Sequence, residues 1–170
     1  MFDVEAAAAT TAGSPGPYVI ALPTGLELIN SNQSQHPRRR ARIVKAIRNA
    51  THEAVTEQPA LMKALADAKP GPLFQRAHIL GILHPPKNDR RDPANWYPSF
   101  KAAVDGIVDA GLLEDDDHTR VVGPDMRLGE KRADGQLVLV VRSLKPGEDP
   151  LGDAALAGVQ WPDREAVTCR

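Results

Sequence analysis

The sequence is poor in cysteine and in aromatic residues. One cysteine, Cys169, stands next to the C-terminal residue, and aromatic residues make up only 4% of the 170-residue chain. A lone thiol forms no internal disulfide and lacks partners for a thiolate metal site, so neither disulfides nor zinc–cysteine clusters stabilise this chain. This cysteine usage fits the reducing cytoplasm. The hydrophobic residues, 42% of the chain, must therefore build an aliphatic core.

Long apolar runs are also absent. No stretch approaches the roughly 20 apolar residues that span a bilayer, so we expect no contact with a membrane. Residues 1–16 lack the basic start and apolar run of a secretory signal, and their Ala, Gly, Ser, Thr and Pro content predicts a disordered arm. Residues 17–144 are expected to form one domain, followed by a loosely ordered tail over residues 145–170.

The chain has almost no net charge. The formal value is −1, so the molecule as a whole is not a polycation, and any affinity for nucleic acid must come from local clustering. Six basic residues fall within eleven positions: Arg38, Arg39, Arg40, Arg42, Lys45 and Arg48. They could form a merely solvated helix face. The local excess favours contacts with a DNA backbone, which Arg90 and Arg91 would extend.

The spacing of apolar residues predicts the order β, α, α, β, α, β, β. Strands are expected at 18–23, 73–85, 119–128 and 137–144, and helices at 38–58, 59–69 and 97–111. The strand at 73–85 is apolar on both faces, which predicts a central position in the sheet. Asp134-Gly135 is a tight-turn signal, so the last two strands are expected to form a hairpin. The expected fold class is α+β, a small mixed sheet of about four strands with helices packed on it.

Two acidic segments flank the helix expected at 97–111. Asp92 stands between Arg91 and Pro93, and four acids follow the helix at residues 114–117. An Asp before Pro is typical of a helix N-cap, so capping is one interpretation of Asp92. The later acids repel each other beside the negative end of the helix dipole, and a divalent cation such as Mg²⁺ would offset that cost. The two segments meet only if the returning chain crosses the helix or a second subunit supplies one of them.

The segment "RRDPANWYPSFKAAVDGIVDAGLLEDDD", residues 90–117, resembles the signature of the RusA family of Holliday junction resolvases. The matching residues are Arg90, Arg91, Asp92, Asn95, Lys101, Asp105, Gly111, Asp115 and Asp116. Upstream, "LINSNQSQHPRRRARIVKAIR" is similar to the family's Asn-containing loop and basic first helix, and the likeness covers about residues 18–144. One acidic position of the family is occupied by Ala94, and the stretch that leads to Lys101 is longer here.

The resemblance implies a homodimeric endonuclease that resolves four-way DNA junctions with Mg²⁺ or Mn²⁺. Asp92, Asp116 and Lys101 would be catalytic. The metal ligands would be Asp92, Asn95, Asp115 and Asp116, with Asn95 or an acid from 115–117 replacing the carboxylate missing at Ala94. Two identical subunits suit this activity because a junction needs two symmetric cuts.

Three alternatives stay open from the residues alone. Lys101 and Asp105 are four positions apart, so they could form an ordinary helical ion pair instead of a catalytic pair. Trp96 could belong to the core or could stack on an unpaired base. The chain could also bind branched DNA without cutting it, or be a metal-dependent nuclease that acts on other branched DNA.

Overall fold

Four strands form one mixed sheet in the computed structural model, which describes residues 16–87 and 91–150. The elements are β1 (Tyr18–Ala21), α1 (Pro37–Thr56), α2 (Pro59–Ala68), β2 (Ala77–His84), the short 3₁₀ helix η2 (Pro93–Trp96), α3 (Tyr97–Asp109), β3 (Val121–Leu128) and β4 (Gln136–Ser143). The spatial order of the strands is β1-β4-β2-β3. Both the α+β class and the predicted order of elements along the chain are confirmed.

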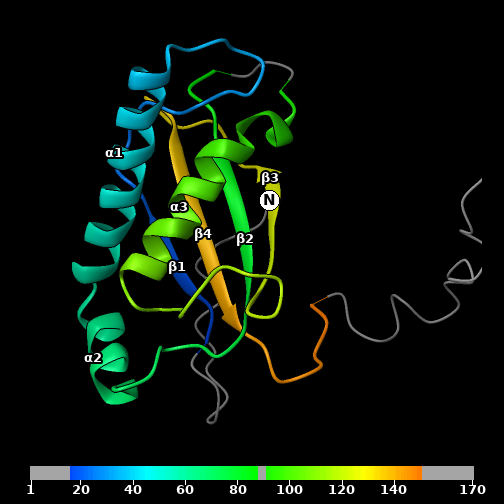
Figure 1. Cartoon of the computed structure of the whole chain (residues 1–170). Helices are drawn as coiled ribbons and strands as arrows, with labels where there is room; N and C mark the ends of the chain where they lie inside the picture. The colour runs from blue at the N-terminus through cyan, green and yellow to red at the C-terminus, as the bar shows by residue number, and fades with distance from the viewer. Residues whose placement is uncertain (1–15, 88–90, 151–170) are drawn as a thin grey trace, which may run out of the picture.

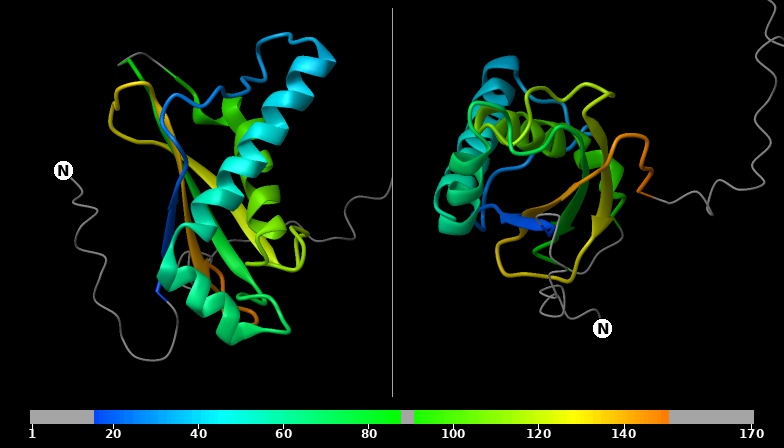
Figure 2. Two further views of the ribbon diagram at one scale, coloured as in Figure 1. Left: turned by 90° about the vertical axis from the view of Figure 1, so that its left-hand side faces the viewer. Right: turned by 90° about the horizontal axis from the view of Figure 1, so that it is seen from below.

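Helices α1 and α3 lie on the same side of the sheet (Figure 1, Figure 2). Helix α1 begins at Pro37, at the position where a missing backbone N–H costs nothing. Its residues Ile43, Ile47 and Ala50 recur at helical spacing and are buried, which explains why this face turns towards α3 and the strands. The opposite face of α1 is exposed and carries most of its arginines.

Close packing of α3 depends on two residues without side chains. A Cβ atom at Gly81 of β2 would lie 2.3 Å from the ring of Phe100, which is fully buried on α3. A Cβ atom at Gly106 of α3 would lie 2.6 Å from the carbonyl oxygen of Arg48 on α1. These two glycines let α3 approach the sheet on one side and α1 on the other.

The predicted hairpin between the last two strands is wrong. Strand β2 lies between them, because it pairs in parallel with β3 and antiparallel with β4. The turn itself forms where the sequence places it: Asp134 and Gly135 have φ values of 62° and 72°, as tight turns of this type require. The central position predicted for β2 is confirmed, because β2 is hydrogen-bonded to a strand on each side, although one of its faces is only half-buried.

Residues 145–150, the first part of the predicted tail, turn back towards the sheet. The carboxylate of Glu148 accepts a hydrogen bond from Arg142 at 3.1 Å, and its carbonyl oxygen accepts one from Arg76 at 2.5 Å. The rest of that tail, the predicted arm up to residue 15 and Arg90 lie outside the described residues. Across residues 16–87 and 91–150, no helix is both long enough and apolar enough to cross a membrane.

Candidate active site

Lys101, on α3, holds two carboxylates that come from different parts of the chain. Its Nζ donates a hydrogen bond to Oδ1 of Asp105 at 2.6 Å and a second to Oδ2 of Asp116. Asp105 lies one helical turn further along α3, as the predicted helical ion pair requires. Asp116 belongs to the loop after the helix, so the returning chain does cross back over α3.

The loop between α3 and β3 is held in place by two buried leucines that precede its acidic residues. Gly111, with φ of 84°, ends the helix in the left-handed conformation that the sequence predicts. Leu112 and Leu113 follow and are almost completely buried. They anchor the chain against the core, and the acids after them then turn back along the outer side of α3. Asp116 is further positioned by its own backbone N–H, which donates to Oδ1 of Asp115 at 2.7 Å.

Electrostatic coupling keeps Lys101 and Asp116 ionised at neutral pH. The hydrogen bond from Lys101 is the main cause that lowers the pKa of Asp116, and it outweighs the opposing effect of burial. For Lys101, burial is the largest single influence and favours the neutral amine. The hydrogen bonds to Asp105 and Asp116 together outweigh it and raise the pKa of Lys101.

Asp92 has the structural role that its sequence context suggests. Its Oδ1 accepts a hydrogen bond from the backbone N–H of Ala94 at 2.9 Å, and the side chain is exposed. The element that Asp92 caps is the separate 3₁₀ helix η2, whereas α3 begins only at Tyr97, after η2 has ended. The backbone carbonyl of Asn95 accepts a hydrogen bond from Ser31. These two predicted ligands therefore sit at the entrance of α3.

The remaining acids of the loop have other local partners. Oδ1 of Asp117 accepts a hydrogen bond from the backbone N–H of Thr119 at 2.7 Å, and Glu114 forms an ion pair with Arg120. Repulsion among the clustered acids is thus relieved by separate protein groups. Over residues 16–87 and 91–150, no three His, Cys, Asp or Glu side chains group closely enough to hold one metal ion.

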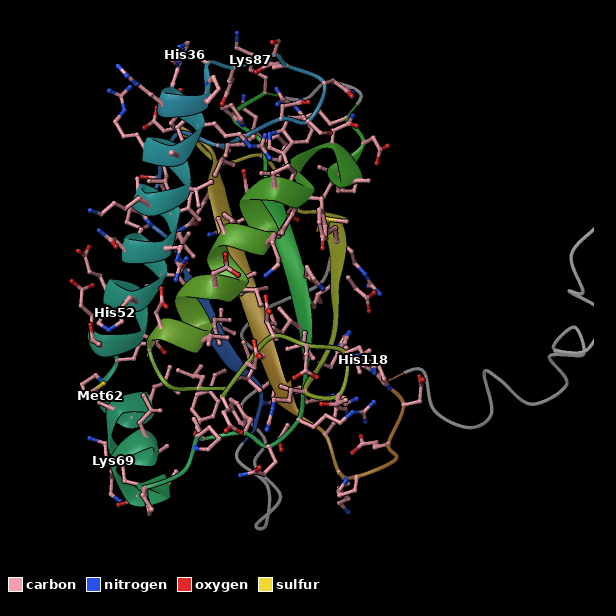
Figure 3. All side chains as sticks on the ribbon, viewed as in Figure 1. His36, His52, Met62, Lys69, Lys87 and His118 are labelled. Carbon is pink, nitrogen blue, oxygen red and sulfur yellow. The ribbon has the colours of Figure 1, made fainter. Side chains whose placement is uncertain are left out.

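Three histidines lie at separate places in the fold. His36 stands at the start of α1, His52 near the end of the same helix, and His118 on the loop before β3 (Figure 3).

The basic residues of α1 differ in how they are paired. Arg39 forms an ion pair with Glu27 at 2.5 Å, and Arg48 donates two hydrogen bonds to the carboxylate of Asp109. The other four predicted DNA contacts are exposed and make no ion pair within the described parts of the chain: Arg38, Arg40, Arg42 and Lys45. Positive charge is therefore available mainly on the N-terminal half of α1.

A groove between α1 and α3 joins the basic face to the lysine–carboxylate group. Its volume is about 240 Å³. Its lining comprises Arg40 and Val44 from α1 and Tyr97, Pro98, Lys101, Ala102 and Asp105 from α3. A second, more open hollow of about 590 Å³ runs further along α1 and shares Arg40. An anionic chain bound along α1 would thus reach Lys101 across one groove.

The sequence did not predict this groove, because no local pattern reports how closely two helices approach.

Comparison with known proteins does not identify the function of the site. No protein-family model matches the chain, and no curated protein is similar enough to be counted as a relative. Function must therefore be inferred from the residues and their arrangement.

Proposed function

We propose that this chain is a Mg²⁺-dependent endonuclease that cuts branched DNA and acts as a homodimer on four-way junctions. The observation that carries the proposal is the meeting of Lys101, Asp105 and Asp116 at a groove whose other wall contains Arg40. Phosphodiester cleavage needs acidic ligands for a cation beside positive groups for the phosphate. The resemblance of residues 90–117 to the RusA signature supports the same activity.

The two carboxylates that contact Lys101 are oxygen donors of the kind that a hard divalent cation prefers, although no third acidic side chain among the described residues joins them. Asp105 and Asp116 converge on a single ammonium group, so both carboxylates already face one shared positive charge. Carboxylate oxygens are the ligands that Mg²⁺ and Mn²⁺ prefer. When bound, the ion would stabilise charge on the phosphate and acidify the attacking water. On the resemblance, Asp92, Asn95 and Asp115 would complete the ligand set.

Lys101 and the arginines of α1 would act on the DNA itself. Lys101 is a flexible point charge, so it could exchange its carboxylate partners for an oxygen of the scissile phosphate. Arg38, Arg40 and Arg42 would hold phosphates on the same strand away from the cut. Such backbone contacts position the DNA without reading its sequence, which suits an enzyme that selects a branched shape.

Cleavage of a synthetic junction tests this proposal. Purified protein is incubated with a four-way junction or with a linear duplex of the same sequence, in Mg²⁺ or in chelator. We expect paired symmetric nicks in the junction alone, no nicks in chelator, and loss of cutting in Asp116→Asn. Asp67→Asn is the matched control, because Asp67 makes an equivalent lysine pair on the exposed surface of α2. If the wild-type protein does not cut the junction in Mg²⁺, the proposal is contradicted.

A second function has an observation in its favour. Ala94 removes one carboxylate of the family signature, and Lys101 already neutralises two of the acids that a cation would need. These features favour a protein that binds branched DNA without cutting it. In the same experiment, tight junction binding in chelator with no cutting in Mg²⁺ or Mn²⁺ would select this function.

A further inference from the structure

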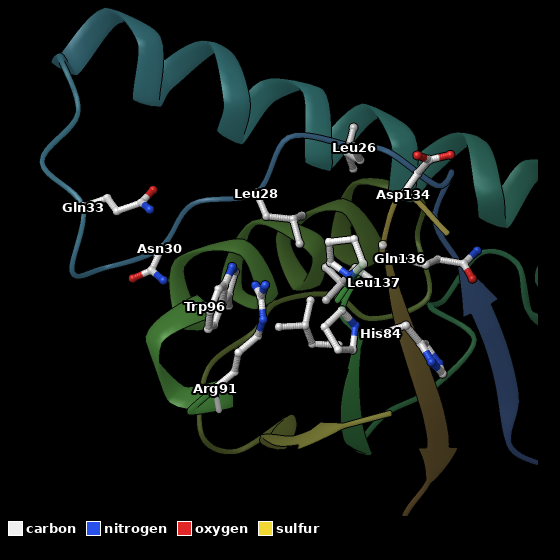
Figure 4. A pocket seen from close by; sticks show the side chains of 14 residues that line it. Leu26, Leu28, Asn30, Gln33, His84, Arg91, Trp96, Asp134, Gln136 and Leu137 are labelled. Carbon is white, nitrogen blue, oxygen red and sulfur yellow. The ribbon is translucent and has the colours of Figure 1, made fainter. Parts of the chain in front are cut away.

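A further cavity, separate from the groove and from the hollow along α1, lies beside η2. Its volume is about 260 Å³, and it lies between the end of β2, the start of β4 and the loop that precedes α1. Four leucines supply apolar surface: Leu26, Leu28, Leu83 and Leu137. Figure 4 shows the side chains of Trp96 and Arg91 next to each other in this cavity. The nuclease site proposed above uses neither of them for its lysine–carboxylate group.

Trp96 and Arg91 form a cation–π pair. The guanidinium carbon of Arg91 lies 5.5 Å from the centroid of the indole ring, over its face. This arrangement is a cation–π contact, which holds both flat groups in a defined orientation. An indole face and a guanidinium plane are both protein surfaces on which unstacked nucleobases can stack.

The loop before α1 supplies two amide side chains to the cavity. Asn30 and Gln33 both line it, and each carries an amide that can donate and accept. Oδ1 of Asn30 accepts a hydrogen bond from the backbone N–H of Asn32 at 2.9 Å, which orients the side chain and leaves its NH₂ group available. Gln136 also lines the cavity, but its NH₂ group donates to the carbonyl oxygen of Leu22.

Two consecutive residues, at the junction of η2 and α3, line the cavity and the groove. Trp96 lines the cavity, while Tyr97, the next residue, lines the groove that contains Lys101. The loop that carries Asn30 and Gln33 continues directly into the arginines of α1. A strand whose phosphates lie along α1 and Lys101 would therefore pass the mouth of the cavity.

We propose that this cavity binds one unpaired base of the bound DNA. The base stacks on the Trp96–Arg91 pair, and Asn30 donates a hydrogen bond to its edge. This inference rests on the proposed function, because the basic face of α1 is what brings a nucleic-acid strand to the cavity. Bases at the branch point of a junction flank a break in the helical stack, so one of them leaves the stack at lower cost than a base inside an intact duplex. The cavity would thus distinguish a branched strand from an intact duplex.

Abasic junctions test the cavity separately from cleavage. Binding is measured in chelator with four-way junctions that lack one base at each position around the branch point. We expect wild-type protein to bind one of these junctions about 5-fold to 100-fold more weakly than the intact junction, the loss that one stacked base accounts for. Trp96→Leu keeps an apolar side chain but removes the flat ring. It should bind the intact junction more weakly by the same factor and show no further loss at that position.

Two variants serve as controls. Trp96→Phe should restore part of the position-specific loss, because it retains an aromatic face. Tyr97→Leu removes the neighbouring aromatic ring on the groove side, so it should leave the abasic pattern of the wild type unchanged. If circular dichroism shows that Trp96→Leu is unfolded, Arg91→Ala and Asn30→Ala are measured in its place and should each reduce the position-specific loss.

The outcomes separate the two proposals. Wild-type binding that is equally strong at every abasic position overturns the base-binding cavity, and it leaves the nuclease proposal standing if the intact junction is bound and cut. A position-specific loss that persists unchanged in Trp96→Leu also overturns it. Absence of binding to any DNA overturns both proposals together.

Discussion

Lys101 and Asp116 form an ion pair across 15 residues of the chain. The same ammonium group also holds Asp105, one turn along the helix. Lys101 therefore performs two tasks, of which the sequence suggested only the first. It is the partner of a helical neighbour, and it also fixes the position of a carboxylate from the following loop. Two acids that would otherwise repel each other are brought to one point by a positive charge from the protein.

Replacing Asp116 should affect activity far more than stability. The side chains of Lys101 and Asp116 are 42% and 23% exposed, and ion pairs this accessible contribute about 1 kcal/mol or less. We expect Asp116→Asn to reduce junction cleavage by about 100-fold or more, the effect of losing one preorganised charge at a reacting centre. Urea unfolding should show a free energy close to that of the wild type. A large loss of stability with cleavage retained would assign Asp116 a purely structural role.

The contribution of Lys101 to stability should depend on pH in a defined direction. Because the folded-state pKa of Asp116 is lowered, the ion pair stabilises the protein above the ordinary pKa of Asp and loses this effect as pH falls through the folded value. The raised pKa of Lys101 keeps the amine charged up to its ordinary value and beyond. The wild type should therefore be more stable than Lys101→Met near neutral pH, and the difference should shrink below about pH 4.

Urea unfolding of both proteins in chelator, from about pH 3 to about pH 8, measures this difference. Lys63→Met is the matched control, because Lys63 pairs with Asp67 at 2.5 Å and both side chains are largely exposed. Its difference from the wild type should be small at every pH. A Lys101→Met difference that stays constant as the carboxylates become protonated would contradict an electrostatic origin.

Local signals in the sequence predicted local structure well. Asp134-Gly135 forms the turn that its composition indicates, Gly111 ends α3, and Asp92 caps the residues that follow it. Each of these features depends on one or two residues and on the conformations that they prefer. The pairing of strands is different, because it depends on contacts between segments that are far apart in the chain. Strand β2 is apolar on both faces and takes the interior position, which separates β3 from β4 in spite of the turn between them.

The candidate site could be predicted only in part for the same reason. The pair of Lys101 and Asp105 follows from helical spacing, and it is present. The pair of Lys101 and Asp116 depends on the path of the loop, which is set by the burial of Leu112 and Leu113 against the core. No spacing rule reports that path. The groove beside Arg40 likewise depends on the distance between two helices.

The arginines of α1 should not contribute equally to DNA binding. Arg40 is exposed beside the groove, whereas Arg48 is held by two hydrogen bonds from its guanidinium group to Asp109, which raise its pKa. Arg40→Gln should lower the slope of log affinity against log salt concentration by about 1, the effect of losing one phosphate contact. Arg48→Gln should change that slope less. Titration of a labelled junction at several salt concentrations distinguishes the two variants, and equal slopes would contradict the assignment.

Gly106 should be the residue of α3 that tolerates substitution least. A Cβ atom there would lie 2.6 Å from the backbone oxygen of Arg48 and 2.7 Å from Cβ of Thr51, so α1 and α3 would have to move apart. Overpacking of this kind costs about 1 to 3 kcal/mol, more than the roughly 1 kcal/mol that Ala gains over Gly in a helix. We expect Gly106→Ala to lower the free energy of unfolding in urea. Gly71→Ala is the control, because its nearest atom would lie at 3.7 Å.

The same substitution should also weaken the proposed activity. The groove is lined by Arg40 on α1 and by Lys101 on α3, so any increase in the separation of the two helices moves the phosphate-binding charge away from the carboxylates. Cleavage measured well below the unfolding transition should therefore fall in Gly106→Ala by more than its junction affinity falls, because misplacement of a positioning group reduces the rate most. Equal losses in binding and cleavage would indicate that the substitution only removes folded protein.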